Sequence, residues 1–283
     1  MLATVASFPA QVTMYLTYYL TPEPGGLTVT YPGTAGDKLR KHDSRAVRVQ
    51  DLRSCQDGGK DFTLDRSGFQ LVGHDCAERD FHDPERVKTV AYEETEALLK
   101  KATGASKARQ MGRCHRGKQA GKRQDGHNQS YAGALQVLQD NTPQASLPHS
   151  SKCRRGIINV WHPLGSKPIT RDPLAVCDRQ SFCESDVHPV LAKTPSKGQG
   201  TFDNVSPGGE FETWNIVANP EHKWDHASRM RPDEALLINC FDSKTDGRAR
   251  CSPHSAFKTE FDEGGPRESC EVRCLVFWEA ERC

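Results

Sequence analysis

Apolar and polar positions follow different patterns in the two halves of the chain. Beyond Arg155 the apolar residues are concentrated in short runs, which are GIINVW, PLAVCD, FETWNIVA, EALLINCFD and EVRCLVFW. Turn-forming segments such as NPEHKW, RPDE and EGGPRE separate these runs. Several short strands at this spacing predict an all-β sandwich or barrel. Together with the helices predicted earlier in the chain, they indicate a mainly β fold with flanking helices.

Two helices are predicted in the first half of the chain. The segment DPERVKTVAYEETEALLKKATG (83–104) starts with Asp83 as a cap and Pro84 in the first turn, and Gly104 ends it. A second helix follows Ser130, a residue type that favours the N-cap position. Its apolar stripe comprises Tyr131, Ala134, Leu135 and Leu138. Each helix has one apolar face with which it can cover a sheet.

The N-terminal region carries weaker patterns. The segment VTMYLTYYL (12–20) is rich in Thr, Val and Tyr and predicts a strand. Residues 21–60 are rich in Pro, Gly and charged residues, which predicts loops around short strands. The segment DFTLDRSGFQLV (61–72) predicts two short strands around a Ser-Gly turn.

A strongly basic stretch lies between the two predicted helices. From Lys100 to Arg123 there are nine Lys and Arg residues and no acidic residue, and apolar residues are almost absent. We interpret residues 100–128 as a mobile basic loop within a single domain that spans residues 1–283. The alternative is a nucleic-acid or phosphate-binding patch, but the stretch lacks the interleaved aromatic residues that stack on bases.

The overall composition narrows the class of protein. The formal net charge of +1 argues against a globally basic nucleic-acid binder. No segment is long and apolar enough to predict a membrane span. The 11 cysteines include no CxxC pair, and their spacings do not fit a zinc ribbon. We therefore expect free thiols in a reducing compartment, the cytoplasm.

The C-terminal region holds the most informative combination of polar residues. Arg267 and Ser269 are two positions apart, so on a strand both side chains face the same way. Arginine offers a planar bidentate fork to a carboxylate, and serine adds a hydroxyl donor. His254, from a neighbouring strand, would place a metal close by. This arrangement suits a small keto-diacid, although a surface arginine, a turn serine and a core histidine would give the same spacing.

Motifs spread over nearly the whole chain add a family resemblance. They are FTLDRSGFQL, VKTVAYEETEALLKKATGAS, IINVWHPL, DPLAVCD, FETWNIVANPEHKW, MRPDEALLINCFDSKTDGRAR, PHSAF and PRESCEVRCLVFW. With these motifs the chain resembles the fungal AsaB-like hydroxylase/desaturase family. That family is related to the gibberellin desaturase and to the oxygenase component of cephamycin methoxylation.

The resemblance implies a double-stranded β-helix (jelly roll) that uses iron(II) and 2-oxoglutarate. In such enzymes two histidines and one carboxylate hold the iron and leave positions open for the cosubstrate and oxygen. His254 matches the distal histidine ligand, and Arg267 and Ser269 match the 2-oxoglutarate clamp. Trp161, Asn219, His222 and Trp224 fall in family-like motifs without an assigned role, and packing is the expectation for both tryptophans.

The segment QDGHNQSYAG (124–133) departs from the family pattern. Family members carry His-x-Asp directly before a helix that starts like Gln-Ser-Tyr, but here Gly126 and Asn128 occupy those positions. In one explanation Asp125 and His127 form a reversed pair on one strand face and still bind the metal. In a second, Asn128 replaces the carboxylate and holds iron weakly. In a third, residues 107–128 are degenerate and the chain is a non-catalytic paralogue or carries a disturbed coding sequence.

Other histidines and acidic residues are weaker candidates for metal ligands. Asp225 and His226 form a possible rival pair with His222, although a polar turn explains them equally simply. His115 lies in the basic stretch, and His162 stands where the family usually has an arginine.

We therefore predict an oxidoreductase that hydroxylates or desaturates a small organic, secondary metabolite with iron(II), 2-oxoglutarate and O2. The expected metal ligands are His254, His127 and either Asp125 or Asn128, and Arg267 and Ser269 bind the cosubstrate. The alternative is a catalytically impaired or non-catalytic paralogue that binds a metabolite on the same fold. We expect no membrane partner, and a nucleic-acid partner is disfavoured.

Overall fold

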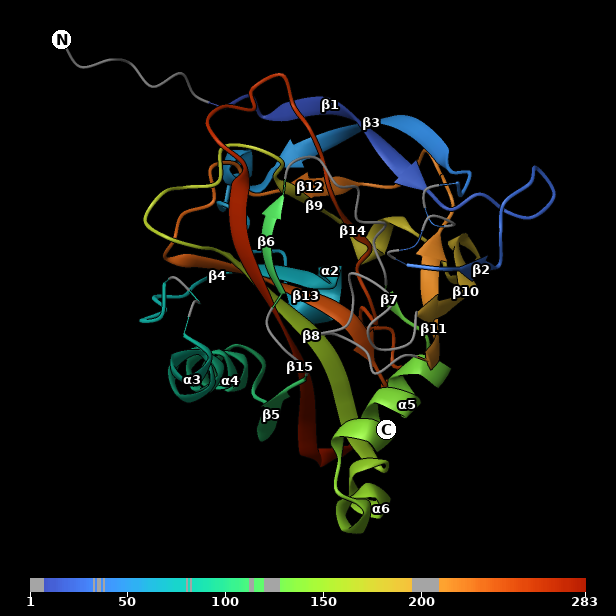
Figure 1. The fold of residues 1–283 in the computed structure, drawn as a ribbon, viewed down its shortest axis with the longest axis vertical. Coiled ribbons are helices and arrows are strands. Elements are labelled where there is room, and N and C mark those ends of the chain that lie inside the picture. Colours follow the sequence, from blue (N-terminus) through green and yellow to red (C-terminus); the bar gives the residue numbers. More distant parts are fainter. Residues whose placement is uncertain are drawn as a thin grey trace.

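The structure is a computed structural model, shown in Figure 1, and it covers most of the chain. It describes residues 8–32, 34, 37, 39–79, 81, 83–111, 115–119, 128–194 and 209–283. For 84, 115–119, 128, 129, 131 and 194 it describes the backbone and not the side chain.

Strands dominate the described part of the chain. The strands are β1 (Gln11–Tyr18), β2 (Val29–Thr30), β3 (Asp43–Asp51), β4 (Phe69–Gly73), β5 (Lys107–Gln110), β6 (His115–Gln119), β7 (Asn128–Gln129), β8 (Cys153–Pro163), β9 (Leu174–Cys177), β10 (Val187–Thr194), β11 (Gly209–Ile216), β12 (Trp224–His226), β13 (Glu234–Asp242), β14 (His254–Ala256) and β15 (Arg267–Arg282). The helices are α2 (Leu64–Ser67), α3 (Pro84–Arg86), the π-helical turn η2 (Val87–Ala91), α4 (Tyr92–Thr103), α5 (Tyr131–Asn141) and α6 (Leu147–Ser150). Short 3₁₀ turns are η1 (Leu52–Ser54), η3 (Gln144–Ser146), η4 (Arg179–Ser181) and η5 (Glu184–Asp186).

The strands form three sheets, two of which face each other. One sheet has the order β1-β3-β12-β9-β14, and the other has the order β4-β13-β8-β15, with β5 and β6 both paired to β15. A smaller sheet has the order β2-β10-β11-β7. Leu174 and Val176 of β9 pack in one apolar cluster with Trp161 of β8 and Leu236 of β13. The β1-to-β14 sheet and the β4-to-β15 sheet therefore enclose a common interior, as in a jelly roll.

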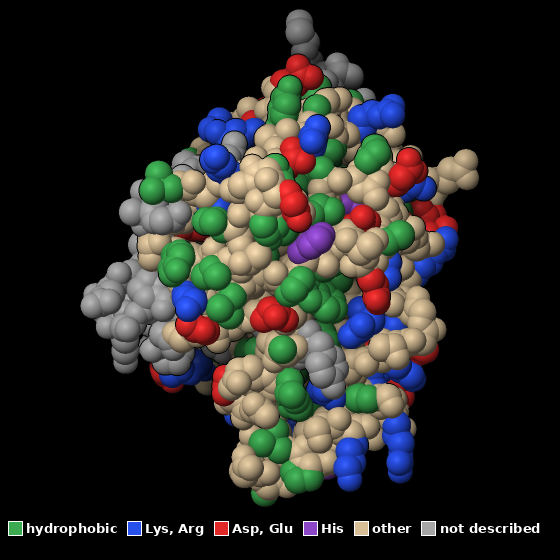
Figure 2. All heavy atoms as spheres, turned by 90° about the vertical axis from the view of Figure 1, so that its right-hand side faces the viewer, with side chains coloured by type: hydrophobic (Ala, Val, Ile, Leu, Met, Phe, Trp, Pro, Cys, Tyr) green, Lys and Arg blue, Asp and Glu red, His purple; other side chains and the backbone are tan. Residues whose placement is uncertain are grey.

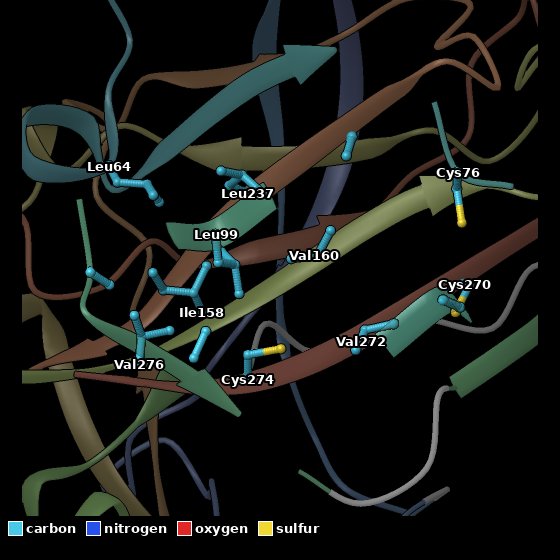
Figure 3. Close-up of a cluster of buried hydrophobic side chains, with 14 of the residues drawn as sticks. Leu64, Cys76, Leu99, Ile158, Val160, Leu237, Cys270, Val272, Cys274 and Val276 are labelled. Carbon is cyan, nitrogen blue, oxygen red and sulfur yellow. The ribbon is translucent and has the colours of Figure 1, made fainter. Parts of the chain in front are cut away.

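Helices cover the outer face of the β4-to-β15 sheet. Ala91 and Leu99 of the η2–α4 segment pack against Val160 of β8 and Val272 of β15, together with Cys274 (Figure 3). All eleven positions of β8 are buried, because this strand has the interior on one face and the helical layer on the other. The predicted mainly β fold with flanking helices is confirmed.

Most predicted elements occur where the sequence placed them. The helix predicted at 83–104 spans α3, η2 and α4, and it ends at Gly104 in the left-handed conformation, with φ of 69°. Ser130 caps α5, since its Oγ accepts a hydrogen bond from the Gly133 backbone N–H at 3.0 Å. The strand predicted at 12–20 is β1, and the five apolar runs lie in β8, β9, β11, β13 and β15.

One prediction for the N-terminal region was wrong. The first half of segment 61–72 is the helical turn α2 rather than a strand, because Gly68 (φ 85°) ends it with a left-handed residue that a glycine adopts without strain. A Cβ at Gly68 would also lie 2.9 Å from the Cys251 carbonyl oxygen, so the position has no space for another residue. The short strands predicted within 21–60 include β3, which at nine residues is longer than expected, because charged residues interrupt its pattern.

The loop predicted at 100–128 is wrong for several of its residues. Helix α4 extends to Thr103, and β5 and β6 both pair antiparallel with β15. The sixteen-residue strand β15 offers a long edge, and pairing to it uses backbone hydrogen bonds that need no apolar pattern. Within β5 only Ala108 joins the core, which explains why the residue types of this segment do not predict a strand.

The cysteines depart from expectation at one position. Nine of the described cysteines are free, but Cys270 of β15 is disulfide-bonded.

None of the helices in the described ranges combines the length and apolar character that a membrane span requires. On the face shown in Figure 2, acidic and basic side chains are interspersed rather than gathered into one broad region of a single sign.

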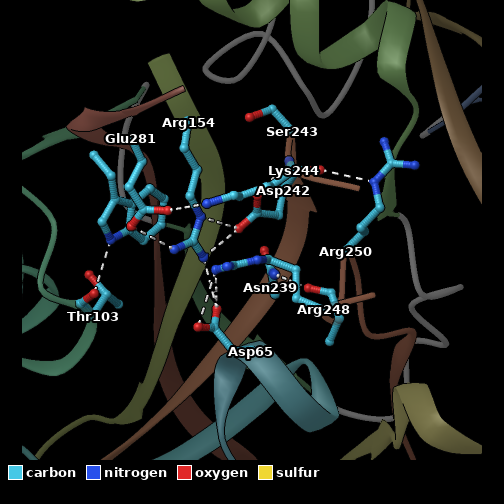
Figure 4. Close-up of polar contacts among 12 residues, drawn as sticks. Asp65, Thr103, Arg154, Asn239, Asp242, Ser243, Lys244, Arg248, Arg250 and Glu281 are labelled. Carbon is cyan, nitrogen blue, oxygen red and sulfur yellow. Dashed lines mark hydrogen bonds and ion pairs between the residues drawn. The ribbon is translucent and has the colours of Figure 1, made fainter. Parts of the chain in front are cut away.

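A buried ion-pair network joins β8, β13 and α2. The Arg154 side chain is 5% exposed and lies 2.7 Å from Asp242 and 2.8 Å from Asp65 (Figure 4). Its guanidinium also stacks on the Trp278 ring, 3.8 Å from the centroid. The network ties the end of β8 to the neighbouring strand and helix.

We expect Arg154→Met to lower the free energy of unfolding by about 3–5 kcal/mol, because Asp242 would remain buried without its partner. Arg229→Met is a matched control, since Arg229 pairs with Glu263 on the surface with side chains 44% and 58% exposed, and its loss should cost under about 1 kcal/mol. Urea unfolding at pH 7 measures both values. Equal effects of the two substitutions would contradict a structural role for the buried network.

Buried histidines should make stability pH-dependent. Burial lowers the pKa of His162 to about 4, with a further contribution from His74, and burial also lowers the pKa of His226 to about 4. In the unfolded chain an imidazole has a pKa of about 6.5, so the folded state binds these protons more weakly. The contribution of these two histidines to stability is therefore complete above pH 6.5 and falls as the pH decreases from about 6.5 to about 4.

We expect His162→Phe to remove only part of this acid-induced loss, because burial also lowers the pKa values of His74, His222 and His226. The surface variant His149→Phe should leave the pH dependence unchanged, since His149 is exposed. Urea unfolding between pH 4.5 and 7.5 measures the slope for each variant. An unchanged slope in His162→Phe would contradict this account, because it would mean that His162 binds protons equally in the folded and unfolded states.

Candidate active site

Arg267 and Ser269 open strand β15 on the face that borders the interior. They are 5% and 4% exposed, while Glu268 between them is turned away and more exposed. Ser269 lies opposite Pro163 of β8 and Gly117 of β6, so neighbouring strands fix its position on both sides. The predicted common face of the two side chains is confirmed by this register.

The Arg267 guanidinium is held by the backbone and by an aromatic ring. Its Nη1 donates a hydrogen bond to the Asp172 carbonyl oxygen, and the guanidinium lies over the Trp161 ring at 5.2 Å from the centroid. Burial lowers the pKa of Arg267 to about 10, so the side chain stays cationic at neutral pH. A fixed, buried cation beside a hydroxyl is an arrangement that binds a carboxylate.

His254 lies in the sheet that faces β15. Its strand β14 pairs with β9, and His254 lies opposite Val176. Residues opposite each other in an antiparallel pair share a face, and Val176 packs with Trp161 in the interior cluster. His254 and Arg267 therefore border the same interior from facing sheets.

The hydrogen bond of His254 selects a tautomer suited to binding a metal. Its Nδ1 lies 3.0 Å from the Ser252 carbonyl oxygen, to which the protonated nitrogen donates. The lone pair is then on Nε2, and no described residue forms a hydrogen bond with this atom. Metal-binding histidines are typically oriented by such a carbonyl contact, so His254 fits the role of an iron ligand.

The other predicted ligands are placed only in part. The backbone of Asn128 pairs with Trp214 of β11 at the edge of the small sheet, and β7 lies against β13 of the β4-to-β15 sheet. Its side chain is not described, and Asp125 and His127 lie outside the described residues. Within the part of the chain that the structure describes, no three His, Cys, Asp or Glu side chains form a group that could hold a metal.

The rival metal group does not converge. Asp225 and His226 are adjacent in β12 and therefore face opposite sides of the sheet. His222 lies with its Nε2 3.3 Å from the Asp186 carboxylate. Burial raises the pKa of Asp225 to about 7. His115 is in β6, and its side chain is not described.

Two tryptophans and one backbone carbonyl group lie in or near the candidate site. Both tryptophans are buried as predicted: Trp161 packs in the interior cluster, and Trp224 donates from its Nε1 to the Tyr18 hydroxyl at 2.8 Å. Sequence reasoning missed that Trp161 also lies under the Arg267 guanidinium. Asp172 was missed as well, because it acts through its carbonyl; its left-handed φ of 47° is unusual for a residue with a side chain.

The matched family model is described as an oxidoreductase/YMDC permease-like domain, and the match spans residues 16–277. The hydroxylase/desaturase efuI of Hormonema carpetanum is 41% identical, and the alignment covers 98% of each chain. The hydroxylase/desaturase asaB of Aspergillus flavus is 35% identical over 87% of this chain and 86% of its own.

Named dioxygenases are also similar to this chain. The Fe(II)/2-oxoglutarate-dependent dioxygenase nvfI of Aspergillus novofumigatus is 30% identical over 93% of this chain and 90% of its own. A solved structure described as the iron and alpha-ketoglutarate-dependent endoperoxidase NvfI superposes with a TM-score of 0.73 at 23% identity. That superposition covers 96% of this chain and 99% of the other, and it confirms the jelly-roll fold.

Proposed function

Because the chain belongs to the AsaB-like fungal hydroxylase/desaturase family, we propose that it hydroxylates or desaturates a small organic metabolite with iron(II), 2-oxoglutarate and O2. The observation that carries this proposal is the convergence of His254 and the Arg267–Ser269 pair on one interior. An imidazole with an available Nε2 suits iron(II), and a buried cation with a neighbouring hydroxyl suits the far carboxylate of 2-oxoglutarate.

Each of these side chains has a defined task in the proposed reaction. Arg267 binds the far carboxylate of 2-oxoglutarate, and Ser269 donates a hydroxyl hydrogen bond to it. Trp161 and the Asp172 carbonyl oxygen keep the guanidinium in place, so the cosubstrate meets a preorganised site. The Ser252 carbonyl oxygen orients the His254 ring toward the metal.

The bound iron, together with 2-oxoglutarate and O2, supplies the oxidising power for breaking an unactivated C–H bond. The protein surrounds this chemistry with buried side chains from facing sheets, including Trp161, Val176 and Leu236. This apolar lining keeps water away from the reacting centre and favours a substrate that is mainly hydrocarbon.

We further propose that the remaining ligands come from the segment QDGHNQSYAG. Asp125 and His127 supply a carboxylate and an imidazole in the first arrangement, and Asn128 supplies an amide oxygen in the second. Single variants Asp125→Asn, His127→Gln and Asn128→Ala separate the two arrangements when iron(II) affinity is measured under anaerobic conditions. The variant that weakens iron binding identifies the ligand, whereas three neutral variants would assign the segment no role in metal binding.

Succinate release tests the proposed activity directly. The wild-type protein with iron(II), 2-oxoglutarate, ascorbate and O2 should convert 2-oxoglutarate into succinate, even without the natural substrate, at a slow uncoupled rate. The non-catalytic alternative predicts 2-oxoglutarate binding without succinate. In that case Gly126→His with Asn128→Asp, which restores His-x-Asp, should create the activity if only the ligands were lost.

The remaining features of the proposal concern the whole chain. We propose that residues 1–283 act as a single oxygenase domain and that the enzyme works in the cytoplasm. The nine free cysteines among the described residues support a reducing environment. Neither a membrane nor a nucleic acid takes part in the proposed reaction.

A further inference from the structure

Strand β1 lies at the edge of its sheet. Among the described segments only β3 pairs with it, and Figure 1 shows it at the upper margin of the molecule. The pairing with β3 runs without a register shift from Gln11 to Tyr18. One side of β1 is therefore a long, regular edge of the kind that readily accepts another strand.

Backbone hydrogen bonds at both ends of β1 show which residues point to the open side. The Asp51 N–H donates to the Ala10 carbonyl oxygen at 2.9 Å, so the even-numbered residues exchange hydrogen bonds with β3. The Tyr19 N–H instead donates away from β3, to the Ile216 carbonyl oxygen at 2.9 Å. The backbone groups that point outward belong to Gln11, Thr13, Tyr15 and Thr17.

The side chains of β1 give this edge no protection. The sequence QVTMYLTY contains no charged residue and no proline, which are the usual devices against strand addition. Tyr15 is 74% exposed, although large apolar side chains are mostly buried elsewhere. On the opposite face, Val12, Met14 and Leu16 belong to an apolar cluster that ends at this edge.

We infer that β1 pairs antiparallel with β1 of a second copy of this chain, around a two-fold axis at Met14. In this register Gln11 of one copy lies opposite Thr17 of the other, and Thr13 lies opposite Tyr15. All outward backbone groups then find partners, giving about eight hydrogen bonds between the copies.

The side chains of β1 in one copy also fit those of β1 in the other copy. The same register places Val12 opposite Leu16 and joins the two apolar clusters into one layer across the axis. The absence of charge means that two copies do not repel each other along this edge. A symmetric pair also closes, so it gives a dimer and not a fibre.

Strand pairing alone buries less surface than a standard stable interface, so the dimer forms at micromolar concentrations. Sedimentation velocity of the full chain from about 1 to 200 µM should show a rise from 31.4 kDa toward twice this mass. The variant T13K/Y15K places like charges across the axis on side chains that point to solvent, and it should stay monomeric throughout the range.

The matched control is S44K/A46K, which adds the same charge at exposed positions of β3, one strand away from the edge. This variant should dimerise like the wild type. Hydrogen exchange provides a second measurement that does not depend on a variant: the Thr13 and Tyr15 amides of the wild type should exchange more slowly at 200 µM than at 1 µM. A wild type that is monomeric at 200 µM, or a dimer that survives T13K/Y15K, would overturn the inference.

Discussion

Replacing Arg267 with glutamine should weaken 2-oxoglutarate binding by roughly 30-fold or more. The guanidinium is the cation that meets the far carboxylate, and removing one partner of a buried charge pair costs about 2–5 kcal/mol. Glutamine keeps some hydrogen-bonding capacity but carries no charge and has no planar fork. Anaerobic isothermal titration of 2-oxoglutarate into the iron-loaded protein measures the change in Kd.

Two further variants make this result specific. Arg155→Gln is the matched control, because Arg155 is buried like Arg267 and also donates a hydrogen bond from its Nη1 to a backbone carbonyl oxygen, that of Ser151. It should leave the Kd of 2-oxoglutarate unchanged. Arg267→Lys should recover part of the affinity, since the charge returns without the bidentate geometry. If Arg155→Gln weakened binding as much as Arg267→Gln, the effect would be one of general stability.

Replacing His254 with alanine should weaken iron(II) binding by at least about 100-fold. Mutation of the groups that merely orient a metal ligand costs about 10- to 100-fold in affinity, and loss of the ligand itself should exceed this. Anaerobic equilibrium dialysis with iron(II) reports the affinity without requiring turnover. Because 2-oxoglutarate chelates the metal, its binding should weaken in parallel.

His226→Leu is the control for this second prediction. His226 is fully buried in the same sheet, but its β12 neighbour Asp225 is on the interior row with Val176, so His226 faces the other side. Its ring contacts Phe8 and Phe257 at 5.3 Å between centroids, so it is a packing residue. Iron affinity should be unchanged in this variant. Equal loss of iron binding in both variants would remove His254 from the site.

The sequence predicted the parts of the fold that depend on apolar patterning. Strands such as β8 and β13 are buried along their whole length, so their runs of apolar residues are unmistakable. Strands β5 and β6 are held mainly by the backbone edge of β15, and such pairing leaves almost no pattern in side-chain type. Helix α2 was missed because Gly68 reads equally well as the tip of a hairpin and as the end of a helical turn.

In the candidate site, too, the sequence predicted the local features and missed the contacts between distant segments. The common face of Arg267 and Ser269 follows from their spacing, since alternation along a strand is a local property. The place of His254 across the interior depended on the resemblance, because no local rule says which strands lie opposite each other. Trp161 and the Asp172 carbonyl oxygen support Arg267 from distant segments, and a carbonyl contact is invisible in the residue types.

The central claim is that iron(II) and 2-oxoglutarate bind together in the interior bordered by His254 and Arg267. Anaerobic titration of the wild-type protein with iron(II) in the presence of excess 2-oxoglutarate tests it most directly. We predict a weak visible charge-transfer band that saturates at one iron per chain and that is much weaker in Arg267→Gln at 2-oxoglutarate concentrations that just saturate the wild type. The absence of any band at saturating iron(II) and 2-oxoglutarate would contradict the account.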